Sequence, residues 1–192
     1  MKKKNIAILA SGSGTNAENI IRYFSASPLA SVKLVLSNNP NAYVLKRAEN
    51  HAVKTCLFNR EQFYNSGKVS QILKENLIDL VVLAGFLWLI PTGMIKDYPG
   101  RIINIHPALL PRYGGKGMYG IHVHRAVIES GDKESGISIH YVNERYDEGN
   151  IIFQASCPVS VNDTPETLAD KIHELEHKHY PKVIEEVIKA RG

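Results

Sequence analysis

Short apolar, β-branched runs alternate with longer amphipathic segments along the first half of the chain. Runs of the first kind are typical of buried strands, and apolar positions that repeat every three or four residues are typical of helices. The predicted strands are Ile6–Leu9, Val32–Leu36, Lys54–Phe58, Leu80–Leu83 and Arg101–Ile105. The predicted helices are Asn16–Phe24, Ala42–Asn50, Gln62–Glu75 and Pro91–Lys96. This alternation predicts a doubly wound α/β fold with one mostly parallel sheet.

The second half of the chain has a different pattern. A predicted helix at His122–Ser130 is followed by two longer strand candidates, Ser135–Val142 and Asn150–Pro158. We expect these two strands to pair antiparallel at one edge of the sheet. Thr164 and Pro165 then have the residue types favoured at the N-cap and the first position of a helix.

The last helical segment contains a proline. We expect the helix that begins at Pro165 to run to about Lys178, and Pro181 to open a separate helix at Val183–Lys189. The apolar positions of that last helix fall on one face. The sequence has no internal repeat and no linker long enough to divide it, so residues 1–192 are predicted to form a single domain.

Composition narrows the class of protein. No apolar run reaches the roughly 20 residues of a membrane span, and the apolar stretch after the N-terminal lysines is too short for a signal peptide. We therefore predict a cytoplasmic protein with no membrane contact. Cys56 and Cys157 form no CxxC pair, which suits reduced thiols. The net charge of +4 comes without a basic stripe, so small anionic ligands are expected as partners and nucleic acid is not.

A glycine turn follows the first predicted strand. Gly12-Ser-Gly14-Thr-Asn-Ala17 fits G-x-G-x-x-A, which places backbone N–H groups and a helix N-terminus around an anion. A dinucleotide site would need an acidic residue about 20 residues further on, and none occurs between Glu18 and Glu49. We expect the turn to bind a single phosphate monoester, with dinucleotide binding and a purely structural turn as the alternatives.

A second polar motif ends the predicted strand that starts at Arg101. Asn104 supplies an amide donor, and the ordinary pKa of His106, about 6.5, lets its side chain donate a proton near neutral pH. Asp147, in a turn-rich segment after a predicted strand, is a carboxylate that could bind an imidazolium. This set suits acyl transfer, because it could stabilise a tetrahedral oxyanion and move one proton. His140 is expected nearby as a packing or hydrogen-bonded histidine.

Five motifs, in this order, resemble the folate-dependent formyltransferases over nearly the whole chain. They are Ser11-Gly-Ser-Gly-Thr-Asn16, Val82-Leu-Ala-Gly-Phe86, Asn104-Ile-His106-Pro-Ala-Leu-Leu-Pro111, Asp147-x-Gly149, and Glu176-His177 ahead of Tyr180-Pro181. The resemblance implies transfer of a formyl group from 10-formyltetrahydrofolate, as co-substrate, to the primary amine of glycinamide ribonucleotide, without a metal.

The resemblance also implies a role for each motif. In catalysis, Asn104 would polarise the formyl oxygen, His106 would donate a proton, and Asp147 would keep His106 protonated and relay the amine proton through water. The residues implied for the ribonucleotide are Gly14, Thr15 and Asn16, which would bind its phosphate, and Glu176, which would contact its glycinamide and ribose. The residues implied for the folate are Arg60, Leu87, Trp88, Leu89, Ile90 and Asn104. The family often has a basic residue in place of Trp88.

Two features stay open in the sequence. The glycine-rich segment Arg112–Gly120 is either a lid or a disordered connector. The acceptor is also open, because methionyl-tRNA, sugar-nucleotide and water-using relatives share the Asn, His and Asp set. A methionyl-tRNA formyltransferase would need a further domain after this one, and the water-using deformylase would need a regulatory domain before it. The length therefore favours the small nucleotide as acceptor. A nucleotide-binding regulator without turnover is the alternative from another class, and a monomer and a homodimer both fit.

One string suggests a different chemistry. His173-Glu174-Leu175-Glu176-His177 matches H-E-x-x-H, the zinc motif of some hydrolases. A third ligand is needed as well, and we expect Pro181 to end the helix before Glu185 could be presented. We therefore predict no metal, with Glu176 as a substrate ligand and His173 at the rim of the ribose site.

Overall fold

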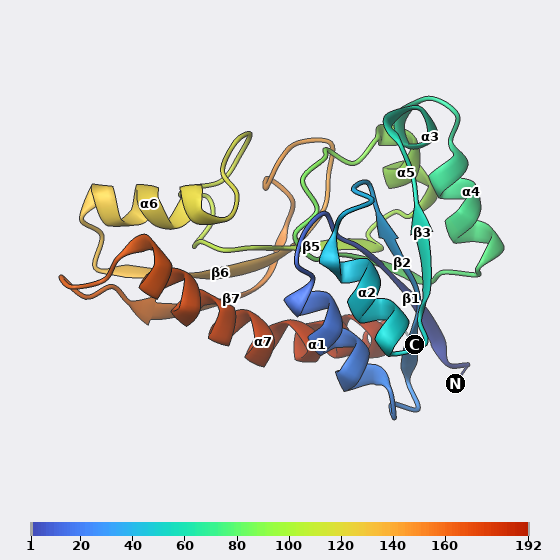
Figure 1. The fold of residues 1–192 in the computed structure, drawn as a ribbon, viewed down its shortest axis with the longest axis horizontal. Coiled ribbons are helices and arrows are strands. Elements are labelled where there is room, and N and C mark those ends of the chain that lie inside the picture. Colours follow the sequence, from blue (N-terminus) through green and yellow to red (C-terminus); the bar gives the residue numbers. More distant parts are fainter. Residues whose placement is uncertain (1, 192) are drawn as a thin grey trace.

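Seven strands form one sheet in the computed structural model, which describes residues 2–191 (Figure 1). Five strands run parallel: β1 (Lys4–Leu9), β2 (Ala30–Ser37), β3 (Lys54–Leu57), β4 (Leu80–Leu83) and β5 (Ile102–His106). Two more, β6 (Glu134–Tyr141) and β7 (Ile151–Pro158), extend the sheet antiparallel beyond β5. The order across the sheet is β3-β2-β1-β4-β5-β6-β7. The predicted fold class and the predicted antiparallel edge are both confirmed.

Helices pack on both faces of this sheet. One face carries α1 (Thr15–Phe24), α2 (Tyr43–Asn50), α6 (Ile121–Ser130) and α7 (Pro165–Lys189). The other face carries α3 (Arg60–Tyr64), α4 (Lys68–Glu75) and α5 (Thr92–Asp97). Because successive side chains of a strand point to opposite faces, Ile6 and Ile8 of β1 join the first core, and Ala7 and Leu9 join the second. Among residues 2–191, no helix is both long enough and apolar enough to cross a membrane.

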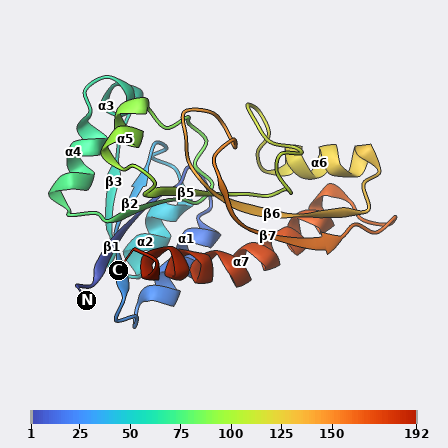
Figure 2. The ribbon, with the colours of Figure 1, turned by 180° about the vertical axis from the view of Figure 1, so that it is seen from behind.

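The strand order reverses between β1 and β4. The chain continues from β1 to β2 on one side of this point, and from β4 to β5 on the other. In an open α/β sheet such a reversal leaves a crevice beyond the carboxyl ends of the strands, where ligands bind. The turns after β1 and β4 are joined there, since the N–H of Ser11 donates to the carbonyl of Gly85 at 3.0 Å. α6 lies toward one end of the molecule and α4 toward the other (Figures 1 and 2).

The prediction of one helix over Gln62–Glu75 is wrong. The structure has α3 up to Tyr64 and α4 from Lys68. α3 begins early because Asn59 and Gln62 form a capping box, in which each side chain accepts from the other residue's N–H, at 2.9 and 3.0 Å. Gly67, with a φ of +65°, then precedes α4 in a left-handed conformation that interrupts the helix.

The predicted break at Pro181 is also wrong. α7 begins as expected, with Thr164 as its N-cap, but it continues through Pro181. Proline has no N–H, so the carbonyl of His177, four residues earlier, lacks its helical partner. The side chain of Asn19 on α1 replaces that partner, because its Nδ2 donates to the same carbonyl at 2.8 Å. α1 therefore satisfies the backbone group that the proline leaves open.

We expect the Asn19→Ala substitution to lower the free energy of unfolding by about 1 kcal/mol, because it removes a hydrogen bond to a carbonyl without a helical partner. In a Pro181→Ala background, the restored N–H of residue 181 binds that carbonyl, and the same substitution should cost much less. Urea unfolding of the wild type, the two single variants and the double variant measures this coupling. Equal costs of Asn19→Ala in both backgrounds would contradict the assignment.

Candidate active site

Asn104 and His106 lie at the carboxyl end of β5. They are two residues apart and therefore point to the same side of the sheet. β6 runs antiparallel beside them, with His140 opposite Asn104 and Ser138 opposite His106. The hydroxyl of Ser138 donates to the carbonyl of Ala108 at 2.7 Å. The start of the loop after β5 is thus fixed to β6.

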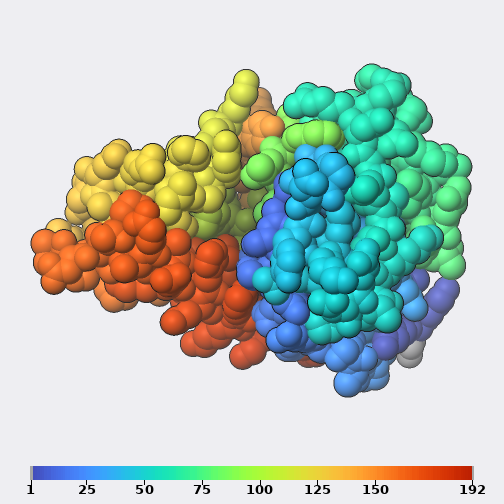
Figure 3. Space-filling view, in the orientation of Figure 1, coloured from blue at the N-terminus to red at the C-terminus, as the bar shows by residue number. Residues whose placement is uncertain are grey.

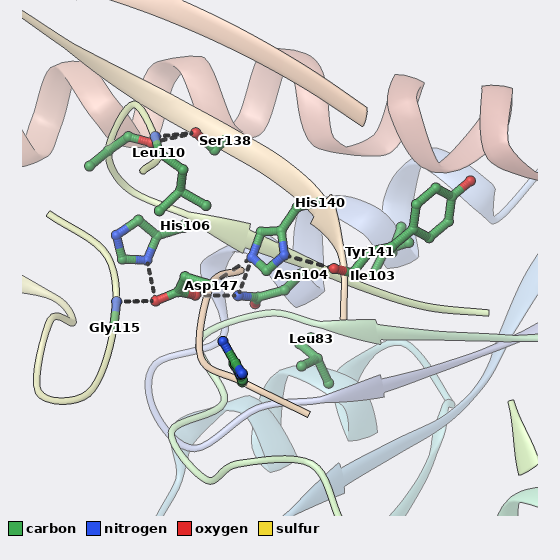
Figure 4. A network of polar contacts seen from close by, with 12 residues as sticks. Leu83, Ile103, Asn104, His106, Leu110, Gly115, Ser138, His140, Tyr141 and Asp147 are labelled. Atoms are coloured by element: carbon green, nitrogen blue, oxygen red, sulfur yellow. Dashed lines mark hydrogen bonds and ion pairs between the residues drawn. The ribbon is translucent and has the colours of Figure 1, made fainter. Parts of the chain in front are cut away.

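Asp147, in the connection between β6 and β7, brings these side chains together (Figure 4). Its Oδ1 lies 3.5 Å from Nδ2 of Asn104 and 3.6 Å from Nε2 of His140. Its Oδ2 accepts from the N–H of Gly115 at 3.0 Å and lies 3.5 Å from Nδ1 of His106. The φ of Asp147 is +57°, in the left-handed region that is unfavourable for a residue with a side chain. Such a conformation persists only where the surrounding contacts impose it.

His106 is buried, and both of its ring nitrogens have partners. Its Nε2 lies 2.7 Å from the carbonyl of Tyr113, which can only accept, so Nε2 carries a hydrogen. In the neutral ring, Nδ1 then directs a lone pair at the carboxylate of Asp147. Protonation of Nδ1 converts this unfavourable contact into an ion pair. The proton that His106 can give up is therefore the one on Nδ1, beside Asp147.

Burial and charge have opposite effects on these two groups. Burial lowers the pKa of His106, and Asp147 together with the Tyr113 carbonyl raises it without restoring its ordinary value. Asp147 thus acts in the predicted direction, but the His106 imidazolium remains a stronger acid than that of a free histidine. Burial raises the pKa of Asp147, whereas a hydrogen bond with His140 and the charge of His106 lower it, leaving a net pKa below the ordinary value. The site therefore holds a carboxylate beside an imidazole that readily loses its proton.

A cavity of about 330 Å³ opens beside these groups. Asn104, His106, His140 and Asp147 line it on one side. The turn after β4 lines it with Gly85, Phe86, Leu87, Trp88, Leu89 and Ile90. The glycine-rich segment contributes residues 115 to 119 and is bonded to the catalytic pair through its backbone. In the structure, this segment therefore forms part of the cavity wall.

The residues implied for the folate have two different positions. Leu87, Trp88, Leu89, Ile90 and Asn104 line the cavity. Arg60 lies behind it, with its guanidinium carbon 4.9 Å from the ring centroid of Trp88, in a cation–π contact. The Trp88 ring also packs against Phe58 and Phe63. Arg60 therefore does not line the cavity itself and contacts it only indirectly, by packing on Trp88.

A second cavity, of about 310 Å³, adjoins the first. The residues that line both are Gly85, Leu87, Ile105 and Tyr119. Ile105 lies between Asn104 and His106 in the chain, so the wall that the two cavities share is next to these two residues. In the space-filling view the surface is hollowed between the yellow segment, which includes α6, and the blue N-terminal residues (Figure 3).

The glycine turn before α1 lines the second cavity. Gly14 has a φ of +77°, and a Cβ at this position would overlap the side chain of Val44, so only glycine fits. The first N–H groups of α1 have no acceptor within the helix, and the helix dipole adds partial positive charge at the same end. Gly14, Thr15 and Asn16 all line the cavity, where these groups form a site suited to a phosphate.

Polar side chains from α6 and α7 complete this second cavity. Glu176 is buried there and accepts from Nδ2 of Asn16 at 2.8 Å. Burial raises the pKa of Glu176, although Asn16 and His173 act to lower it. His124 and His173 also line the cavity. Burial lowers the pKa of His124 to about 4, so its imidazole is neutral at pH 7.

The H-E-x-x-H string of α7 is not part of a metal cluster within residues 2–191, where no three His, Cys, Asp or Glu side chains are grouped to bind an ion. The expectation that Pro181 ends the helix before Glu185 is wrong, because α7 continues through Pro181 and includes Glu185. That carboxylate is bonded instead to the hydroxyl of Tyr23 and lies 3.0 Å from Nζ of Lys189.

Sequence reasoning missed the backbone part of the site. The Tyr113 carbonyl contacts His106 and the Gly115 N–H contacts Asp147, and no side-chain pattern reveals such contacts. His140 is confirmed as a hydrogen-bonded histidine, but it lies at the centre of the network, with Nε2 3.2 Å from Nδ2 of Asn104. The register of the two antiparallel strands is the signal that would have placed it there.

Comparisons with known proteins agree with this geometry. The family model described as Formyl transferase matches residues 4–184. The chain is 39% identical to the chloroplastic phosphoribosylglycinamide formyltransferase of Arabidopsis thaliana, over 99% of this chain and 67% of that protein. It is 37% identical to the phosphoribosylglycinamide formyltransferase of Bacillus subtilis, over 96% of this chain and 95% of that one.

Solved structures give the same result. The crystal structure of phosphoribosylglycinamide formyltransferase from Bacillus halodurans superposes with a TM-score of 0.85 at 40% identity, over 97% of this chain and 95% of that chain. The resemblance seen in the sequence motifs is confirmed: the chain belongs to the formyl transferase family, and the Bacillus proteins that it matches over 95% of their length are phosphoribosylglycinamide formyltransferases.

Proposed function

We propose that this chain transfers a formyl group from 10-formyltetrahydrofolate to the primary amine of glycinamide ribonucleotide in purine biosynthesis. The observation that carries the proposal is that the cavity lined by Asn104 and His106 shares Ile105, the residue between them, with a second cavity. One cavity has the catalytic groups and an apolar turn, and the other has a helix N-terminus suited to a phosphate. The folate that carries the formyl group and the amine that accepts it can therefore approach Asn104 and His106 from two sides.

The folate occupies the first cavity in this proposal. Its heterocycle lies against the turn at Leu87–Ile90, whose backbone can read polar edges and whose side chains are apolar. Arg60 can reach the acidic end of the folate by leaving the Trp88 ring. The ribonucleotide occupies the second cavity, with its phosphate at Gly14–Asn16 and Glu176 near its ribose and glycinamide.

The transfer can be written step by step. The amine nitrogen attacks the formyl carbon, and the formyl oxygen becomes an oxyanion. The amide of Asn104 and the imidazole of His106 bind this oxyanion. The amine proton passes to Asp147 through a water molecule. When the oxyanion collapses, the bond from the formyl carbon to the folate nitrogen breaks, and that nitrogen takes the Nδ1 proton of His106. The products are the formylated amine and tetrahydrofolate.

The first test is product formation from 10-formyltetrahydrofolate by the purified protein, with glycinamide ribonucleotide present and then omitted, each measured with and without a chelator. We expect tetrahydrofolate to appear only when the ribonucleotide is present. Turnover without it would indicate a deformylase that uses water, and no turnover in either case would indicate a nucleotide-binding regulator. Activity that is lost to the chelator and restored by zinc would contradict the metal-free mechanism.

We expect His106→Ala and Asn104→Ala to lower kcat on the order of 10²–10³-fold, because each removes a donor that is needed mainly by the oxyanion. The affinity for folate, measured by calorimetry, should change far less. Asp147→Asn should be comparably damaging, because His106 loses the charge that favours its protonated form. Near-normal turnover in either alanine variant would contradict the catalytic assignment.

The second cavity has its own test. Glu176→Gln should raise the KM for glycinamide ribonucleotide by about 10-fold, because a charge-assisted hydrogen bond becomes a neutral one. The KM for the folate should stay unchanged. Glu174→Gln, an exposed position on the same helix, is the matched control and should alter neither constant. Equal effects of Glu176→Gln on both substrates would indicate a general defect instead of nucleotide binding.

A further inference from the structure

The segment Tyr113–Gly115 contacts both catalytic partners through its backbone. The Tyr113 carbonyl lies 2.7 Å from Nε2 of His106, and the Gly115 N–H donates to Oδ2 of Asp147 at 3.0 Å. Because a carbonyl only accepts, the first contact fixes a hydrogen on Nε2 and leaves Nδ1 for the proton that is transferred. The position of this short segment therefore decides which nitrogen of His106 serves the reaction.

This backbone conformation requires external support. Tyr113 has a φ of +55°, in the left-handed region that bulky residues avoid. Gly114, the next residue, is tightly packed: a Cβ there would lie 2.6 Å from Cδ2 of Leu110 and 3.3 Å from Cβ of Asp147. Some contact outside the segment must keep it in this conformation.

The Tyr113 side chain provides that contact, on the side away from the cavity. Its hydroxyl donates to Oδ2 of Asp132 at 2.6 Å and lies 2.6 Å from Oγ of Ser130. Arg112 pairs with the same carboxylate, and its guanidinium carbon lies 5.3 Å from the Tyr113 ring centroid. The Tyr113 hydroxyl and Arg112 keep the pKa of Asp132 below its ordinary value. Asp132 follows the C-terminal end of α6, so the segment is bound to an element outside its own loop.

We propose that Tyr113 and Asp132 are positioning residues for His106. Their hydrogen bond holds the Tyr113 carbonyl against Nε2, and this contact presents the Nδ1 proton to Asp147 and to the first cavity. Neither residue is among those that line that cavity, so neither touches the substrate. The kinetic part of the test rests on the proposed formyl transfer, whereas the spectroscopic part rests on the geometry alone.

A structural role alone would have a different signature. The Tyr113–Asp132 bond lies near the surface, where a single polar pair contributes little to stability, so breaking it should leave the fold intact. Asp147, His140 and His124 are the titratable groups that act on His106. None of the three is bonded to the Tyr113 hydroxyl or to Asp132, so a change in the titration of His106 would have to pass through the Tyr113 carbonyl.

The test uses Tyr113→Phe, which keeps the ring and the backbone. We expect kcat to fall about 10-fold, because a loosely held general acid loses part of its contribution, with both KM values unchanged. The carbonyl contact raises the pKa of His106, so weakening it should move the limb of the kcat profile that requires the imidazolium to lower pH. Asp132→Ala should do the same, while Asp132→Asn, which keeps an acceptor for the hydroxyl, should retain most of the activity. The kcat of the double variant Tyr113→Phe/Asp132→Ala should be no lower than that of the less active single variant.

Tyr23→Phe is the matched control, because it removes a tyrosine-to-carboxylate bond, to Glu185, that lies between α1 and α7. It should leave kcat and the pH profile unchanged. Nitrogen-15 NMR of the His106 imidazole in the ligand-free protein should show Nε2–H in the wild type and a mixture of tautomers in Tyr113→Phe. An unchanged tautomer ratio, or an unchanged kcat where the wild type is active, overturns the inference. If the wild type forms no product, formyl transfer is what fails, and the tautomer ratio alone decides.

Discussion

The buried carboxylate of Asp147 is the interaction on which the active site depends. An ionised group removed from water needs polar partners, and here they are the amide of Asn104, the Gly115 N–H and the rings of His106 and His140, which donate to the carboxylate only when protonated. Each partner comes from a segment that the fold positions separately: β5, β6 and the glycine-rich loop. The same charge that stabilises the network also favours the protonated form of His106. The structural and the chemical requirements of the site are therefore met by one group.

The contact between α1 and α7 plays the same part for the second cavity. Asn16 binds the carboxylate of Glu176, and one turn later Asn19 binds the carbonyl that Pro181 leaves free. The helix whose N-terminus suits a phosphate is thus joined to the helix that supplies a polar group for the rest of the ligand. Because both asparagines lie on α1, the distance between the N-terminus of α1 and Glu176 is fixed by packed helices and not by a flexible loop.

Much of the fold could be predicted from the sequence, because strand and helix periodicities are local properties. The wrong prediction at Pro181 has a non-local cause, whereas the break between α3 and α4 has local ones, the capping box at Asn59 and the left-handed Gly67. Asn19, distant in sequence, satisfies the carbonyl that Pro181 leaves free, and single-helix reasoning contains no such partner. The site shows the same division. Asn104, His106 and Asp147 could be proposed from residue type, but the Tyr113 carbonyl could not, because every residue has a carbonyl and only the tertiary structure selects one.

The lowered pKa of His106 fits a donor that acts in the transition state. In the free site, burial disfavours the imidazolium more than Asp147 and Tyr113 favour it. An oxyanion that forms beside Nδ1 adds a second negative charge and raises the affinity of the ring for its proton at that moment. Interactions that strengthen only as charge develops lower the barrier, whereas those already complete in the ground state do not. If His106 were fully charged before the reaction, its ion pair with Asp147 would already be complete. The low dielectric of the buried site also strengthens the interaction between the imidazolium and the oxyanion. In the proposed transfer, burial of His106 therefore favours catalysis, because it reserves the strongest interaction of the imidazolium for the oxyanion.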